Sequence, residues 1–527
     1  MKILVLDGVS EKGVEILREP GFEVVVDNEK HTEEELIKII PEYHAVVVRS
    51  ATKITAPVIE AAKNLIVIGR AGVGVDNIDV EAATRHGILV VNAPDGNTIA
   101  AAEHTMALML ALARNIPQAN EKLKAGQWLR KEFMGVELRG KTLGVIGLGR
   151  IGTAVAKRAL AFEMRVLGYD PYVSEEKARS IGVELVSLDE IYRQADFITV
   201  HLPLTKETKY LINKEAFAKM KKGVRIINVA RGGVISEKDL YDAIKEGIVK
   251  GAAIDVFETE PTTESPLFEL DNVIVTPHLG ASTREAQINV ALDVAREIVN
   301  VLQGGMAMNA VNMPAIPQEL MKTLRPYLQL GEKLGKFVAQ IAPEVETVEI
   351  SYSGEIAQLE TAPISTAVLK GLLTPLVEDS VNYVNAGVLA RSRGIKVTEK
   401  KTETAEDYAN LITVRVASER CKCEHSVAGT IFRENDARIV MVDGYRVDAV
   451  PEGYMIVAPH IDKPRIIGRV GTLIGNENVN IASMQVGRKE VGGRAVMLLG
   501  IDAPVSEETL KEIAKVDGIL DVKMVSL

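Results

Sequence analysis

Three polar side chains of complementary types follow apolar runs in the middle of the chain. Arg231 occurs in NVARGGVIS, Glu260 in DVFETEP and His278 in VIVTPHLGAST. A guanidinium can hold a substrate carboxylate, an imidazole can exchange a proton near neutral pH, and a carboxylate can orient the imidazole. Singly, each has a plainer explanation: a structural histidine, a capping arginine, a solvated glutamate. Their joint occurrence at equivalent strand ends predicts an acid–base site beyond a parallel sheet.

A second stretch, KTLGVIGLGRIG at residues 141–152, predicts a dinucleotide site. Gly147, Gly149 and Gly152 fit G-x-G-x-x-G, in which the glycines allow a tight turn, close approach to a pyrophosphate and close helix packing. Asp170 ends the next strand, 18 positions after Gly152. A carboxylate there accepts ribose hydroxyls and repels a 2′-phosphate, so NAD is favoured over NADP. The alternative is a tight turn with a helix-capping aspartate.

Eight histidines occur in the chain, and only some stand at predicted strand ends. His201 ends FITVHLP and could line the cofactor cleft, whereas His31, His44 and His86 are interpreted as surface or core fillers. His104 lies in an Ala-rich stretch predicted to be helical. The residues predicted to contact the cofactor are Gly147, Gly149, Arg150, Ile151, Gly152, Asp170, His201 and Asp255.

The elements that must position these residues are alternating strands and helices. Within residues 1–100, short β-branched runs such as KILVLD and HAVVVRS alternate with amphipathic stretches, which predicts a parallel, doubly wound sheet. One long Ala-rich helix, TIAAAEHTMALMLALARNIPQANEKLKAG, is predicted next. A second α/β series then runs from TLGVIG to NVIVTP, and another long helix from about Ser282 to Gly305.

The last third of the chain has a different character. NMPAIPQEL, with its two prolines, is interpreted as a linker. Residues 317–452 are rich in Thr, Val and Gly and predict an α+β region. Residues 454–527 predict a compact β-α-β-β-α-β module, which is the ferredoxin-like order.

Composition excludes several classes of function. The 527 residues carry a net charge of −10, which argues against a nucleic-acid partner. No apolar run reaches the ~18 residues of a membrane span. Cys421 and Cys423 are too few for a disulfide framework, and their C-x-C spacing alone is more typical of a structural role than of a metal site. With an N-terminus unlike a signal peptide, the sequence predicts a cytoplasmic protein without a metal.

Taken together, the motifs GRAGVGVDNIDV, GKTLGVIGLGRIG, NVARGGVI, AAIDVFETEP and TPHLGAST resemble those of the D-isomer-specific 2-hydroxyacid dehydrogenases. The resemblance covers essentially the whole chain and is strongest to the long, four-domain members, which oxidise 3-phosphoglycerate with NAD in the first step of L-serine biosynthesis. It implies that Arg231 binds the substrate carboxylate and carbonyl. It also implies that Glu260 and His278 form a dyad in which His278 takes the hydroxyl proton.

The same resemblance implies a domain plan. Residues 1–97 and 287–312 would form a flavodoxin-like substrate domain, and residues 98–286 a Rossmann-like nucleotide domain. Residues 317–452 would form an intervening, anion-binding domain, and residues 453–527 an ACT domain. The chain would cross into the nucleotide domain along one long helix and return along the second. The cleft between the two domains would hold the substrate and close over it, excluding water.

A phosphorylated acid requires cations, since phosphate and carboxylate together carry about −3 charges and favour arginine. Arg49 and Arg70 precede turns that should face the cleft, although both could be ordinary salt-bridge partners. The resemblance implies a further basic residue from a neighbouring subunit. The residues predicted to bind substrate are Arg49, Arg70, Gly72, Val73, Gly74, Asn97, Arg130 and Lys131.

The C-terminal half is not needed for the chemistry, so a regulatory or assembly role is expected, and the resemblance implies a homotetramer. It places contacts to L-serine on His460, Asp462 and Asn480. The family's loop then continues with Pro-Gly, whereas this chain has Pro464-Arg465, so serine binding could be weakened, altered or lost. Arg438 and Arg446 are candidates for the anion site of the intervening domain, with solvated strand charges as the alternative.

Two other functions stay open at this point. One is a general glyoxylate or hydroxypyruvate reductase, whose members are usually shorter. The other is an NAD-sensing, corepressor-like binding protein, which would retain the Arg–Glu–His set. Turnover of a hydroxy acid at a physiological rate would separate the enzymes from the binding protein.

Overall fold

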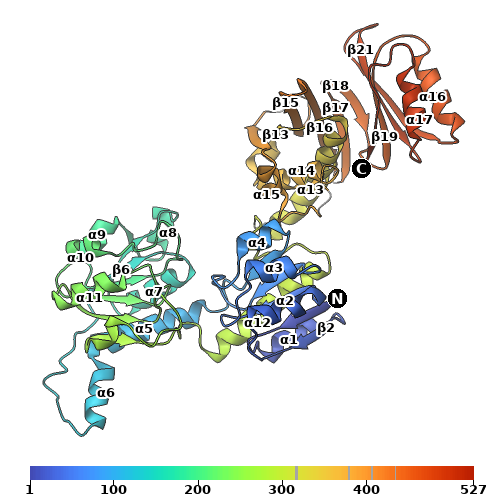
Figure 1. Ribbon diagram of the computed structural model, residues 1–527. Coiled ribbons are helices and arrows are strands. Elements are labelled where there is room, and N and C mark those ends of the chain that lie inside the picture. The colour runs from blue at the N-terminus through green and yellow to red at the C-terminus, as the bar shows by residue number, and fades with distance from the viewer. Residues whose placement is uncertain (315–317, 378–379, 405–406, 434) are drawn as a thin grey trace.

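Four β-sheets, each with its own helices, make up the computed structural model, which describes residues 1–314, 318–377, 380–404, 407–433 and 435–527 (Figure 1). Two parallel α/β domains occupy the N-terminal part, and a mixed and an antiparallel sheet follow. This is the predicted fold class. No helix among the described residues is long and apolar enough to cross a membrane.

The five-stranded domain has the strand order β2-β1-β3-β4-β5, with every pair parallel. The alternating pattern predicted a parallel, doubly wound sheet, and this strand order is the flavodoxin-like one that the resemblance implied. The strands are β1 (Lys2–Val5), β2 (Glu23–Val26), β3 (Ala45–Val48), β4 (Val67–Arg70) and β5 (Leu89–Asn92). Its helices are α1 (Glu11–Arg18), α2 (Glu33–Ile39), η1 (Ile40–Glu42), α3 (Ala56–Ala61), α4 (Val80–Arg85) and the returning α12 (Arg284–Leu302).

Helix α12 belongs to this first domain although it begins 192 residues after the end of β5 (Asn92 to Arg284). Its buried face, including Val290, Val294 and Ile298, joins the core formed by β1, β3, β4 and β5. The approach is close, because a Cβ on Gly69 would lie 2.5 Å from the Val294 side chain. The predicted second long helix is therefore present and closes the first domain.

The seven-stranded domain has the order β12-β11-β10-β9-β6-β7-β8, with parallel pairing throughout, which extends the Rossmann order by one strand. Its strands are β6 (Thr142–Ile146), β7 (Arg165–Tyr169), β8 (Glu184–Leu185), β9 (Phe197–Val200), β10 (Val224–Asn228), β11 (Val249–Ile254) and β12 (Val273–Val275). The helices are α5 (Thr98–Arg114), α6 (Ile116–Lys124), α7 (Arg150–Ala161), α8 (Glu175–Ser180), α9 (Leu188–Gln194), α10 (Lys214–Lys219), α11 (Glu237–Lys245) and η2 (Pro266–Glu269).

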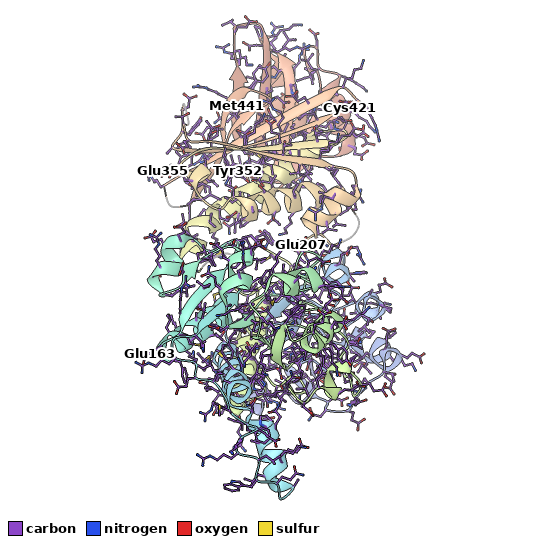
Figure 2. All side chains as sticks on the ribbon, turned by 90° about the vertical axis from the view of Figure 1, so that its left-hand side faces the viewer. Glu163, Glu207, Tyr352, Glu355, Cys421 and Met441 are labelled. Carbon is purple, nitrogen blue, oxygen red and sulfur yellow. A yellow bond between two sulfur atoms is a disulfide. The ribbon has the colours of Figure 1, made fainter. Side chains whose placement is uncertain are left out.

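The prediction of one continuous Ala-rich helix was wrong. The helix ends at Arg114 because Asn115 adopts a left-handed conformation (φ 53°), and Pro117 stands in the first turn of α6. Asparagine tolerates that conformation and proline favours a helix start, so the chain turns here. Helix α6 buries none of its residues and projects away from the domain with the loop that follows it (Figures 1 and 2).

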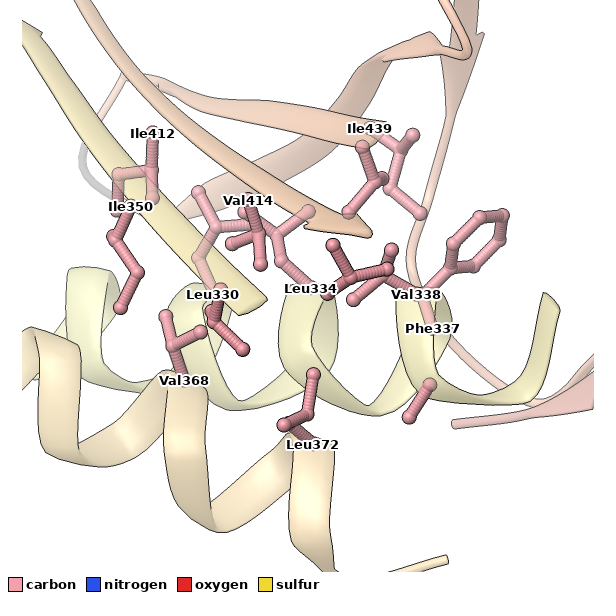
Figure 3. Packing of buried hydrophobic residues seen from close by; sticks show 14 of the residues in the cluster. Leu330, Leu334, Phe337, Val338, Ile350, Val368, Leu372, Ile412, Val414 and Ile439 are labelled. Carbon is pink, nitrogen blue, oxygen red and sulfur yellow. The ribbon is translucent and has the colours of Figure 1, made fainter. Parts of the chain in front are cut away.

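The mixed six-stranded sheet follows the order β14-β13-β15-β16-β17-β18. Its strands are β13 (Thr347–Gly354), β14 (Lys396–Thr402), β15 (Asn410–Ser418), β16 (Cys423–Phe432), β17 (Asp436–Val442) and β18 (Tyr445–Ala449). Helices α13 (Gln318–Ile341), α14 (Ala362–Leu373), α15 (Ala386–Ser392) and η3 (Glu355–Gln358) accompany it. Figure 3 shows Leu330, Leu334 and Phe337 of α13 between the sheet and α14.

The linker that precedes this region and the two cysteines within it can be compared with the sequence predictions. The predicted linker at residues 312–320 lies partly outside the described residues, because 315–317 fall in a gap. A disulfide joins Cys421, in the turn after β15, to Cys423, the first residue of β16, a pairing that the sequence did not predict. Figure 2 labels Cys421 in the upper part of the molecule.

The antiparallel sheet of the last domain has the order β20-β21-β19-β22 and confirms the predicted β-α-β-β-α-β module. Its elements are β19 (Tyr454–Ile461), α16 (Ile466–Asn476), β20 (Ile481–Arg488), β21 (Arg494–Ile501), α17 (Glu507–Ala514) and β22 (Lys523–Ser526). Alternate residues point to opposite faces, so Ile456 and Leu499 pack under α16 and α17, while Val457 and Leu498 join the core around α13. One face of this sheet therefore belongs to the core of the preceding domain, and the other face has a core of its own.

Candidate active site

An imidazole and a carboxylate meet in the loops that follow β11 and β12. His278 Nδ1 lies 2.6 Å from Glu260 Oε2, and the other oxygen of Glu260 accepts the Phe257 N–H at 2.9 Å. Burial alone would raise the pKa of the Glu260 carboxyl. The hydrogen bonds from His278 and Phe257 and the charges of His278 and Arg231 outweigh it and lower that pKa below its usual value. Glu260 is therefore ionised at neutral pH and can orient the ring.

Asp255 holds the turn that carries His278. This carboxylate is fully buried and accepts hydrogen bonds from the Thr276 hydroxyl at 2.5 Å, the Leu279 N–H at 2.7 Å and the Gly280 N–H at 2.9 Å. The Asp255 carbonyl accepts the His278 N–H at 2.8 Å, and His278 itself has a left-handed backbone (φ 53°). The predicted cofactor contact of Asp255 stays a prediction; its observed partners are in the protein.

Arg231 follows β10 and reaches the other α/β domain. Its Nε donates to Asp76 Oδ2 at 3.0 Å, and its Nη1 donates to the Ala230 carbonyl at 2.7 Å. A Cβ on Gly74 would lie 1.8 Å from Arg231 Nη2. Gly74, one of the predicted substrate residues, therefore makes room for the guanidinium.

Three guanidinium groups gather around this point. Burial, followed by the positive charges of Arg231 and Arg49, lowers the pKa of Arg70 to about 10, so Arg70 stays charged at neutral pH. Its Nε is buried and has no hydrogen-bond partner in the part of the chain that the structure describes, and its Nη1 donates to the Ala71 carbonyl at 3.1 Å. Within the described residues, neither Arg49 nor Arg70 forms a salt bridge with a carboxylate. Such a cluster is suited to an anion.

The remaining predicted substrate residues lie on two sides of this cluster. Gly72 (φ 156°) leaves room for Arg70, since a Cβ there would lie 1.5 Å from Arg70 Nη1. The Asn92 side-chain amide donates to the Val73 carbonyl at 2.6 Å. Asn97 precedes α5, and its buried Oδ1 has no partner among the residues that the structure describes. Arg130 and Lys131 are exposed on the loop after α6 and are not brought to this cluster within the chain.

The glycine turn between β6 and α7 fits a dinucleotide. Gly147 has φ 94° and lies against the His201 carbonyl, and a Cβ on Gly152 would lie 1.9 Å from the Gly147 carbonyl oxygen. By contrast, a Cβ on Gly149 would meet no atom of the described residues within 4 Å. The exposed N-terminus of α7 beside Gly149 offers free N–H groups to a pyrophosphate.

The neighbours of this turn are partly engaged by the protein. The Asp170 carboxylate accepts hydrogen bonds from the backbone N–H groups of Leu148 and Tyr172, each with an N–O distance of 2.9 Å. These bonds fix the carboxylate at the end of β7. Burial lowers the pKa of His201 to about 4, which keeps this imidazole neutral, and its Nδ1 has no partner among the described residues. Arg150 pairs with Asp95 at 2.6 Å, and Ile151 packs at the edge of the core under α7.

The predicted regulatory residues are mostly engaged by carboxylates or the backbone. Arg438 pairs with Asp436 at 2.8 Å, and Arg446 with Asp407 at 2.5 Å. His460 is buried, Asp462 pairs with Arg488 at 2.7 Å, and Asn480 donates to Asp502 at 3.1 Å. Arg465 precedes α16 with φ 76°, the conformation that favours the glycine of the resembling family.

Sequence reasoning missed the groups that hold the predicted residues. His104, interpreted as part of a helix, lies 3.2 Å from Asp255, and Thr276 completes that site. Asp76 and Asp95, the partners of Arg231 and Arg150, were not singled out. Asp76 stands inside GVGVDN, next to the predicted glycines, but pairing over 155 positions leaves no local signal.

Comparison with known proteins identifies the class. Residues 106–280 match the family model for the D-isomer specific 2-hydroxyacid dehydrogenase, NAD binding domain. A structure of the TT0316 protein from Thermus thermophilus is 36% identical with a TM-score of 0.55, covering 59% of this chain and 100% of that one. A D-lactate dehydrogenase structure from Escherichia coli is 30% identical with a TM-score of 0.52 over the same shares of the two chains. The fold and site thus define an NAD-binding 2-hydroxyacid dehydrogenase.

The rest of the chain narrows this class. Residues 323–443 match the D-3-phosphoglycerate dehydrogenase intervening domain, and residues 454–518 match the ACT domain. The chain is 51% identical to a D-3-phosphoglycerate dehydrogenase of Archaeoglobus fulgidus and 53% identical to one of Methanocaldococcus jannaschii, over 100% of both chains in each case. A Bacillus subtilis relative of the same name is 46% identical over 100% of this chain and 99% of its own. The chain belongs to the D-3-phosphoglycerate dehydrogenase family, in its long form.

The two glycines of the turn should respond differently to substitution. Gly149→Ala adds a methyl group that meets no protein atom, so we expect an unchanged Tm but an NADH Kd raised about tenfold or more, because the methyl group faces the pyrophosphate path. Gly152→Ala places Cβ against the Gly147 carbonyl and should cost about 1–3 kcal/mol of folding stability. NADH titration and thermal unfolding measure both effects. Wild-type NADH affinity in Gly149→Ala would show that the cofactor does not cross this face.

Proposed function

We propose that this chain oxidises 3-phosphoglycerate to 3-phosphohydroxypyruvate with NAD, the first step of phosphorylated L-serine biosynthesis. The observation that carries the proposal is the cluster of Arg49, Arg70 and Arg231, with the first two free of carboxylate partners in the described residues. A phosphorylated hydroxy acid supplies about three negative charges, which matches the cluster. Family membership and the relatives' names support the same reaction.

The geometry suggests a role for each member of the acid–base set. His278 Nδ1 is committed to Glu260, so the opposite nitrogen, Nε2, takes the hydroxyl proton during oxidation and returns it in the reverse direction. Arg231 binds the substrate carboxylate and carbonyl with the N–H groups it does not spend on Asp76 and Ala230. Bound NAD supplies the hydride acceptor, held by the Gly147–Gly152 turn and Asp170. Closure of the cleft excludes water from this site.

Recognition of the substrate is assigned to the five-stranded domain. Arg49 and Arg70 bind the phosphate, and the backbone of Gly72, Val73 and Gly74 with the Asn97 side chain approaches the remainder. Arg70 is the stronger candidate for the phosphate contact. Its guanidinium is buried beside two other positive charges, so a bound dianion would stabilise it more than an exposed arginine. We also place the domain boundaries at 1–97 with 287–312, 98–286, 317–452 and 453–527, and the protein in the cytoplasm.

The test is NADH oxidation with 3-phosphohydroxypyruvate, hydroxypyruvate and glyoxylate, compared as kcat/KM. We expect the phosphorylated substrate to be preferred by roughly a hundredfold or more, equivalent to ~2.7 kcal/mol of transition-state binding. Equal use of the unphosphorylated acids would contradict the assignment and indicate a general reductase. No turnover of any of them would indicate a binding protein.

Two variants serve as controls in this assay. Arg70→Gln should reduce the preference for the phosphorylated acid while leaving hydroxypyruvate reduction nearly unchanged, because only the phosphate contact is lost. His278→Gln should bind NADH normally and lose turnover by about 10³-fold or more, as expected for a missing acid–base group. Full activity of His278→Gln would contradict the dyad.

We further propose that the chain assembles as a homo-oligomer, a tetramer in keeping with the resemblance. Helix α6 and its loop support this, since they carry large apolar side chains in solvent, including Trp128 at 79% and Met134 at 84% exposure. In an assembly this arm would bring Arg130 or Lys131 to a partner's cleft. Trp128→Ala should shift the protein to smaller species in sedimentation; a monomeric wild type would contradict the proposal.

Regulation by L-serine at the ACT domain is proposed for His460, Asp462 and Asn480, with Arg438 and Arg446 as the anion-site candidates of the intervening domain. Arg465 limits serine binding, since it puts a bulky cation at the glycine position. Because Arg465 has a left-handed backbone, Arg465→Gly should raise stability by about 1 kcal/mol and increase the rise in Tm caused by L-serine. Thermal unfolding with and without L-serine checks both. An equal serine effect in the two proteins would contradict the role of Arg465.

A further inference from the structure

One ion pair joins the two α/β domains at the arginine cluster. Arg231 Nε donates to Asp76 Oδ2 at 3.0 Å, although the residues lie 155 positions apart. Asp76 belongs to the turn between β4 and α4 of the five-stranded domain, and Arg231 follows β10 of the seven-stranded domain. The Asp76 side chain is 67% exposed, so the pair adds little to folding stability. The main effect of the Asp76–Arg231 ion pair is therefore on the orientation of the Arg231 side chain.

The contacts of Arg231 leave the rest of the group available to a ligand. A guanidinium has five N–H donors, of which one is given to Asp76 and one to the Ala230 carbonyl, at 2.7 Å. Nη2 lies where a Cβ of residue 74 would be, 1.8 Å away, so the group fills the space left by Gly74. Asp76 thus holds one end of the fork while three N–H donors remain for a carboxylate.

The turn that carries Asp76 is hydrogen-bonded to the segment that contains Arg49, one of the proposed phosphate ligands. The Ile78 N–H donates to the Val75 carbonyl at 2.9 Å and closes the turn. Asn77 donates to the carbonyls of Arg49 and Thr52 at 2.7 and 2.6 Å. A displacement of this turn would therefore move Asp76 and the Arg49 segment together.

Charge favours the same position for Asp76. Asp76 and Asp7 are the two carboxylates whose charges oppose the lowering of the Arg70 pKa. Asp7 is already bonded to the Arg49 and Thr52 N–H groups and the Thr52 hydroxyl, at 2.8, 3.1 and 2.6 Å. Of these two carboxylates, Asp76 is the one that pairs with a guanidinium of the cluster, and its charge offsets part of the repulsion of Arg231 by Arg70 and Arg49.

We propose that Asp76 is a positioning residue for the oxidation described above: it holds Arg231 from the opposite domain so that the guanidinium presents its free N–H groups to the substrate carboxylate. The inference rests on the proposed function. It assigns to Asp76 no contact with the reacting atoms. Loss of Asp76 leaves Arg231 able to turn away under the repulsion of two neighbouring arginines.

The first experiment is steady-state reduction of 3-phosphohydroxypyruvate by Asp76→Ala and Asp76→Asn in the full chain. We expect the KM for the oxo acid to rise about tenfold or more in Asp76→Ala, and the KM for NADH to stay within about twofold. Asp76→Asn should recover part of the loss, because the amide oxygen still accepts the Nε hydrogen bond. Glu81→Gln, which removes the exposed Glu81–Arg85 pair on the adjacent α4, is the matched control and should behave as wild type.

A double-mutant cycle tests whether Asp76 acts through Arg231. Binding of 3-phosphoglycerate to the NADH-loaded protein is measured by calorimetry, which requires no turnover. Asp76→Ala should weaken binding about tenfold in the wild-type background and less than about twofold in Arg231→Gln, because the group it positions is gone. Equal weakening in both backgrounds would overturn the inference.

The outcomes separate this inference from the proposed function. Wild-type turnover of 3-phosphohydroxypyruvate together with an unchanged oxo-acid KM in Asp76→Ala overturns the positioning role and leaves the function standing. Loss of NADH affinity in Asp76→Ala also overturns it, since that result indicates a general structural role. A wild-type protein inactive on every 2-oxo acid overturns the proposed function, and this inference with it.

Discussion

The buried carboxylate of Asp255 is the constraint on which the acid–base site depends. A fully buried charge is stable only when donors replace its water, and here a hydroxyl, two backbone N–H groups and the His104 ring supply them. These donors come from α5 and from the turn after β12, so satisfying the charge draws both elements to the end of β11. These hydrogen bonds hold the turn that contains His278, whose Nδ1 lies 2.6 Å from Glu260.

Electrostatic imbalance is the second organising feature. The protein keeps Arg49, Arg70 and Arg231 near one another, against burial and like-charge repulsion that lower the pKa of Arg70. Ordinary folding would pair such groups with carboxylates, as it does for Arg438 and Arg446 in the intervening domain. A cluster of positive charges that lacks carboxylate partners, among the described residues, for two of its three members is suited to an anionic ligand. The overall charge of −10 does not reveal this local excess.

Much of the architecture follows from patterns that are local in the sequence. Short β-branched runs, amphipathic stretches and the glycine turn are each legible within one element and its neighbours in the chain. The order of such elements predicted the parallel sheets and the last module. The break at Asn115 was missed because an Ala-rich pattern outweighed the Asn and Pro signals. Partners such as Asp76 for Arg231 and His104 for Asp255 join residues more than 150 positions apart. No periodicity encodes such contacts; they arise only when the domains pack.

The shared core of the two C-terminal domains has a consequence for the evolution of the chain. Met455, Val457, Val496, Leu498 and Val525 of the ACT sheet pack into the same cluster as Leu334 and Phe337, and Gln340 bonds both the N–H and the carbonyl of Ser526, each at 3.0 Å. An ACT domain is often pictured as an interchangeable cassette at the end of an enzyme. If only the residues after 453 were transferred to another protein, the apolar face of the ACT sheet would lose the α13 side chains that cover it. The unit that recombination can transfer intact runs from α13 to the last strand.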